Sequence, residues 1–101
     1  MRTLLKLQFP VEASNAAYKD GRLGRVLQET LERLKPEAAY FTAVDGCRGG
    51  FIVFDLQHPS DIPSICEPFF HELNARCELM PVMTPDDVKT GIDKAQAVAR
   101  N

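Results

Sequence analysis

The sequence predicts one α+β domain with the element order β-α-β-β-α-β and a C-terminal helix, which is the ferredoxin-like arrangement. Three observations predict it: apolar and polar residues alternate at 3–9, Asp45-Gly46 joins two apolar runs, and helical stripes separate the expected strands. At 101 residues the chain has room for one hydrophobic core. We therefore treat residues 1–101 as a single domain.

The first strand, at 3–9, turns Leu5, Leu7 and Phe9 to one side. Ser14 or Asn15 is expected to cap a short turn after it, and Gly21 to separate that turn from the first main helix. The apolar stripe of that helix, which Pro36 ends, consists of Leu23, Val26, Leu27, Leu31 and Leu34.

A hairpin follows, because Asp-Gly between two apolar runs is a strong signal for a tight turn. Its strands are expected at 37–44 and 49–57, running antiparallel. A two-residue turn would place Tyr40 opposite Phe51, whereas a three-residue loop would place Phe41 there.

The second main helix is expected to begin with Ser60 as its N-cap and to kink or restart at Pro68. Residues 76–83 form the fourth predicted strand, in which Pro81 indicates an edge or a bulge. Thr84, followed by proline and two aspartates, is expected to cap the final helix.

Right-handed crossovers predict that the strands at 3–9 and 51–56 are central neighbours, and we expect them to be parallel, with both main helices on one face. The opposite face, called the far face here, would carry Leu4, Lys6, Gln8, Tyr40, Phe51, Val53 and Asp55. In this arrangement Lys6 and Asp55 lie at similar depth and form an ion pair. The pair is either a cavity-lining acid and base with displaced pKa values or a structural contact that fixes strand register.

The far face is too apolar for water and too polar for a dry core, so we expect something to cover it. Nucleic acid is disfavoured, because Gly50, Ile52 and Asp55 replace the aromatic positions of the RNA-recognition signature and the net charge is −2. The final helix could cover its own sheet and give a monomer, but its apolar stripe is weak. The third cover is the same sheet of a second copy.

Almost the whole chain resembles small bacterial proteins of the dimeric α+β barrel superfamily. The segments "FPVE.SNAA..DG.LG", "LKPEAAYFT" and "IP.I.EPFF..LNA..E..PVMTPDD" are similar to an uncharacterised family within it, a domain of unknown function. The resemblance implies the fold and a homodimer, with no assigned reaction. The superfamily includes cofactor-free monooxygenases, muconolactone isomerases and haem-degrading enzymes. The last group uses Asn, Trp and His, and this chain has no Trp.

The remaining candidate residues carry weaker signals. His71 could act as a general base but is expected to face solvent, and His58 lies in a loop. Gly21 and Gly24 match no complete phosphate-binding motif, so helix packing explains them better. Three cysteines at unpaired spacings indicate reduced thiols in a cytoplasm, and no metal motif is present.

These observations predict a cytoplasmic homodimer without a cofactor, a metal, a nucleic-acid partner or a membrane span. It is expected to bind a small organic molecule at Lys6, Gln8, Tyr40, Phe51, Val53 and Asp55. The candidate catalytic residues are Asp55, Lys6 and His71, for a cofactor-independent monooxygenase or isomerase. The alternative is a non-catalytic structural or metabolite-sensing homodimer.

Overall fold

The computed structural model describes residues 1–100 as a four-stranded antiparallel sheet with four helices. The strands are β1 (Arg2–Phe9), β2 (Ala38–Val44), β3 (Cys47–Asp55) and β4 (Arg76–Pro81). The helices are α1 (Val11–Lys19), α2 (Arg22–Leu34), α3 (Ile62–Leu73) and α4 (Pro85–Ala99), and a 3₁₀ turn, η1 (Pro59–Asp61), precedes α3. The predicted α+β class and element order are confirmed.

The strand order is β2-β3-β1-β4, and β1 is antiparallel to both of its neighbours. The expectation that β1 and β3 run parallel is wrong. Each helical crossover joins strands that run in the same direction but are not adjacent, β1 to β2 and β3 to β4. Because the β2–β3 hairpin reverses the chain, β3 enters between β1 and β2 in the opposite direction. Leu5 consequently lies opposite Ile52, and Arg2 opposite Asp55.

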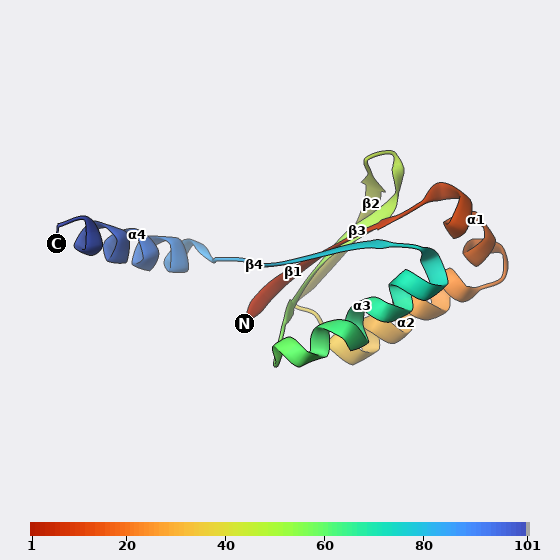
Figure 1. The fold of residues 1–101 in the computed structure, drawn as a ribbon, viewed down its shortest axis with the longest axis horizontal. Helices are drawn as coiled ribbons and strands as arrows, with labels where there is room; N and C mark the ends of the chain where they lie inside the picture. The colour runs from red at the N-terminus through yellow and green to blue at the C-terminus, as the bar shows by residue number, and fades with distance from the viewer. Residues whose placement is uncertain (101) are drawn as a thin grey trace.

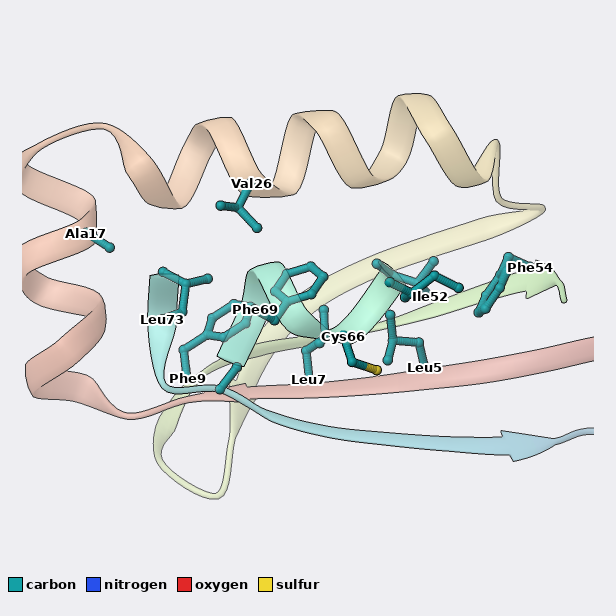
Figure 2. Packing of buried hydrophobic residues seen from close by; sticks show 12 residues of the cluster. Leu5, Leu7, Phe9, Ala17, Val26, Ile52, Phe54, Cys66, Phe69 and Leu73 are labelled. Carbon is teal, nitrogen blue, oxygen red and sulfur yellow. The ribbon is translucent and has the colours of Figure 1, made fainter. Parts of the chain in front are cut away.

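Both main helices, α2 and α3, cover one face of the sheet, as predicted (Figure 1). The core between them and the sheet contains Leu5, Leu7 and Phe9 from β1 with Ile52 and Phe54 from β3. Phe69 of α3 stacks on Phe9 with ring centroids 6.0 Å apart, near the middle of the cluster drawn in Figure 2. The alternation of β1 therefore follows directly from burial on one side only.

Two predicted helix starts differ from the structure. Helix α1 begins at Val11, before Ser14 and Asn15, whose side chains instead accept hydrogen bonds from Arg48. Helix α3 begins at Ile62 rather than after Ser60, because η1 takes up Pro59–Asp61. A proline lies at each of these starts, and its fixed φ favours a helical turn. Pro10 precedes α1, which begins before Ser14, and Pro59 begins η1, which delays α3 beyond Ser60.

Pro68 does not interrupt α3, whereas Pro81 ends β4. Helix α3 is continuous through Pro68, so the predicted restart does not occur. Strand β4 ends at Pro81, earlier than the predicted 83, and lies at the sheet edge as its proline indicated.

The glycines at the start of α2 have unequal roles. Gly21 adopts φ +85° as the residue before α2, which confirms that it separates the two helices. Gly24 has open space where a Cβ would be, so the packing explanation is wrong for this residue.

The hairpin turn fixes the orientation of β2. Asp45 and Gly46 have φ values of 51° and 79°, the left-handed pair that a two-residue hairpin turn requires. Tyr40 then lies opposite Phe51, as the two-residue alternative predicts. Phe41 turns to the helix-covered side, where its ring lies close to the backbone of Gly50.

Helix α4 stands apart from the rest of the molecule and continues outward from the end of β4 (Figure 1). Thr84 caps it as predicted: its hydroxyl accepts from the Asp87 backbone N–H, and the Asp87 carboxylate accepts from the Thr84 backbone N–H. None of its residues is buried. Within residues 1–100 no helix is long and apolar enough to cross a membrane.

Candidate functional site

The far face is uncovered within residues 1–100, since no helix packs on it. The side chains of Leu4, Phe51 and Val53 are half-buried there, although nothing lies above them. Tyr40 is 73% exposed and Met80 is 38% exposed. A sheet face with this apolar content is typical of a surface that packs against another protein layer.

A polar cluster interrupts this apolar surface at the end of the sheet nearest the hairpin turn. Lys6 lies opposite Glu78 across β1 and β4, with Lys6 Nζ 3.8 Å from Glu78 Oε2. Gln8, the next far-face residue of β1, donates from Nε2 to the Val44 carbonyl at 3.3 Å. The cluster surrounds a hollow of about 50 Å³ and consists of Lys6, Gln8, Asp45, Arg76 and Glu78.

The predicted Lys6–Asp55 pair does not form. In the antiparallel register Lys6 lies opposite Phe51, and Asp55 lies at the far end of β3, opposite Arg2. Asp55 does share the far face with Lys6, but the two residues occupy opposite halves of the sheet. The prediction failed because it assumed parallel strands.

Asp55 is instead paired with the start of the chain. The Met1 ammonium lies 2.5 Å from Asp55 Oδ1, and Gln57 donates to Oδ2 at 2.6 Å. The ammonium group, which stabilises the ionised carboxylate, holds the pKa of Asp55 below its ordinary value, and the Gln57 hydrogen bond acts in the same direction. A carboxylate that is harder to protonate is a weaker general base.

Neither histidine lies on the far face. His71 is exposed on α3, as predicted, with its Nε2 2.9 Å from Glu67 Oε2 one turn earlier. His58 is exposed in the segment that precedes η1. Among residues 1–100 no three His, Cys, Asp or Glu side chains gather closely enough to hold a metal ion.

The thiols of Cys66 and Cys77 belong to the helix-covered side of the sheet. Burial raises the pKa of Cys77 to about 12, and the neighbouring Cys66 acts in the same direction. Burial also raises the pKa of Cys66. These groups are therefore thiols at neutral pH and poor nucleophiles.

Sequence reasoning missed three members of the polar cluster, Asp45, Arg76 and Glu78. The alternation within "RCEL" places Arg76 and Glu78 on one face of β4, and that signal was available. It also missed a larger groove of about 510 Å³ where α2 and β3 end and α3 begins. That groove has an apolar floor that includes Phe54 and Ile65, and Arg33 bridges its wall by donating to the Ser64 carbonyl at 2.9 Å.

The far face thus combines an apolar centre with one polar cluster, and five of the six predicted ligand-binding residues lie at that centre or within that cluster. The exception is Asp55, which its register places at the opposite end. Comparison with known proteins adds no constraint on the function. No protein family model, curated protein or solved structure matches this chain.

Proposed function

We propose that this protein is a ferredoxin-like homodimer of the dimeric α+β barrel type, in which two far faces pack together and enclose a small-molecule site. The uncovered far face carries the proposal: Leu4, Phe51 and Val53 present apolar surface that nothing within residues 1–100 covers. A second copy of the same sheet removes that surface from water at about 25 cal/mol for each Å² of apolar area.

The polar cluster is the proposed ligand site. When the dimer closes, Lys6, Gln8 and Glu78 would line an enclosed space, with the Arg76 guanidinium at its rim. Tyr40 brings a phenol hydroxyl from β2 to the same face. This mixture of two cations, two carboxylates and neutral donors suits a small organic molecule that carries both charged and hydrogen-bonding groups.

Turnover of that molecule by a cofactor-independent monooxygenase or isomerase would use Lys6 and Tyr40, because Asp55 lies at the other end of the sheet. A non-catalytic sensing or structural homodimer is the second candidate. The lowered pKa of Asp55 favours it, since the candidate acid or base of the sequence analysis is held ionised by Met1. The three free thiols are suited to the reducing cytoplasm in which we propose that the protein works.

The dimer is tested by light scattering on size-exclusion fractions at micromolar concentration. Phe51→Asp places a charge at the centre of the far face and is expected to give a monomer. Phe70→Asp, at a half-exposed aromatic on α3, is the matched control and is expected to stay dimeric. A monomeric parent protein would contradict the proposal.

The ligand is tested separately by native mass spectrometry of freshly purified protein and of protein incubated with a metabolite extract. We expect added mass on the dimer, and we expect Lys6→Met and Glu78→Gln to remove it without dissociating the dimer. A dimer that carries no added mass in either sample would contradict the ligand site and leave the structural candidate.

A further inference from the structure

Helix α4 has a stripe of side chains with nothing to pack against. Val88 is 38% exposed and Ile92 52% exposed, one turn apart on the same side of the helix. Isolated helices of about 15 residues are marginal in water, and Gly91 in the middle of α4 costs roughly 1 kcal/mol relative to alanine. A helix of this composition needs a surface that covers its apolar side.

The connection between β4 and α4 directs the helix away from its own domain. The Val82 N–H donates to the Arg2 carbonyl at 3.1 Å, so the ladder with β1 continues to within two residues of the helix. Thr84 and Pro85 then start α4 at once, with both hydrogen bonds of the capping box formed. In this arrangement α4 continues outward from β4 and does not lie over its own far face (Figure 1).

The sheet face alone is too small for a stable interface between two copies, so the dimer needs a further contact surface. Four strands spaced by about 4.8 Å and averaging roughly 25 Å in length present a projected face of about 480 Å². A stable interface buries about 800 Å² on each partner. Helix α4, which leaves the edge of that face and is about 22 Å long, is the remaining unpartnered apolar element in residues 1–100.

The charges of α4 do not suit a membrane surface. Its residues include three acids, Asp86, Asp87 and Asp93, and two bases, Lys89 and Lys94. A helix that binds anionic lipid concentrates basic residues on its polar face. Protein is therefore the better surface for the stripe.

We propose that α4 is exchanged between the two copies of the homodimer and packs on the second copy at the rim of the barrel, through Val88 and Ile92. This inference deepens the proposed function and rests on the homodimer. The second copy supplies the apolar surface that α4 does not contact on its own chain.

The test places a photoreactive benzophenone amino acid at position 92, on the stripe, and at position 94 as the matched control on the opposite side of the helix. Illumination of the Ile92-substituted protein should give a covalent product of twice the chain mass on a denaturing gel. The Lys94-substituted protein should give little of it. Mass spectrometry of the product should show α4 joined to a peptide of the other chain.

A second measurement uses the dimer itself. Burial of the Ile92 side chain stabilises the dimer, so Ile92→Asp should raise the dimer Kd at least about tenfold. Lys94→Ala should leave the dimer Kd unchanged. Cross-links confined to one chain, or no more product from position 92 than from position 94, would overturn the exchange. If such a result came from a protein that scatters light as a dimer, the far-face homodimer would stand and only the exchange would fail.

Discussion

Lys6 and Glu78 face each other across β1 and β4, with Nζ and Oε2 3.8 Å apart, and they form a charged pair within the polar cluster of the far face. Sequence reasoning assigned Lys6 to Asp55. The observed partner lies on the edge strand, so the charge pair lines the proposed cavity from β1 and β4 and does not join the two central strands.

Coupling between these two side chains should depend on whether a second sheet covers them. Glu78 is 62% exposed in the single chain, where such a pair contributes less than about 1 kcal/mol. We expect a double-mutant cycle of Lys6→Met and Glu78→Gln to give that value in the Phe51→Asp background and a larger one in the dimer, measured by urea unfolding. Equal coupling in the two backgrounds would show that the pair stays in water.

The Met1–Asp55 contact predicts a specific dependence on pH. A carboxylate whose folded pKa is lowered stabilises the fold above its unfolded pKa, and that contribution is lost as the pH falls through the folded value. Asp55→Asn should therefore be less stable than the parent near neutrality, and the difference should shrink in acid. Urea unfolding at a series of pH values measures it.

The same contact can be checked by NMR titration of Asp55. We expect its midpoint to lie below the ordinary value of 3.8 and to move back toward that value when the Met1 amine is acetylated. A midpoint that acetylation leaves in place would assign the shift to Gln57 instead.

Thiol reactivity should distinguish the two sides of the sheet. With a pKa of about 12, Cys77 is a thiolate in only about 10⁻⁴ of molecules at pH 8. We expect iodoacetamide to modify Cys47 first in the folded protein and to reach Cys66 and Cys77 only after unfolding, as read by peptide mass spectrometry. Equally fast modification of Cys77 and Cys47 would contradict the burial of β4 against α3.

Two glycine-to-alanine changes should have opposite effects on stability. A Cβ at Gly49 would collide with the Leu7 carbonyl oxygen and approach Val44 Cγ2 to 2.7 Å, so Gly49→Ala should lower the free energy of unfolding by at least about 1 kcal/mol. Gly24→Ala in α2 meets open space and should raise it by roughly 0.5–1 kcal/mol. Urea unfolding of both variants decides, and destabilisation by both would show that Gly24 has a contact in the assembled protein.

The element order and the two faces of the sheet followed from local patterns. Alternation in β1 identified Leu5 and Leu7 as core residues because only one side of that strand is buried by helices. The Asp45-Gly46 turn identified Tyr40 as the partner of Phe51 because the turn length sets the register of a hairpin.

The contacts that sequence reasoning missed depend on long-range register. No turn links β1 to β4, so nothing local indicated that Glu78 would lie opposite Lys6. The partner of Asp55 is the Met1 ammonium, and the alternation of apolar and polar residues does not predict a contact with that group. The direction of α4 depends on a ladder bond from Val82 to Arg2, eighty residues apart in sequence.

The number of residues in the Asp45-Gly46 turn decides which side chains of β2 reach the far face. If one residue were inserted there and the turn kept two residues, β2 would slide by one position along β3, and its side chains would change faces because they alternate between the two sides. Phe41 would replace Tyr40 on the far face, and the phenol hydroxyl would turn toward α2. Homologues that differ by a single residue at this turn would keep the fold and exchange the chemistry of the surface it presents.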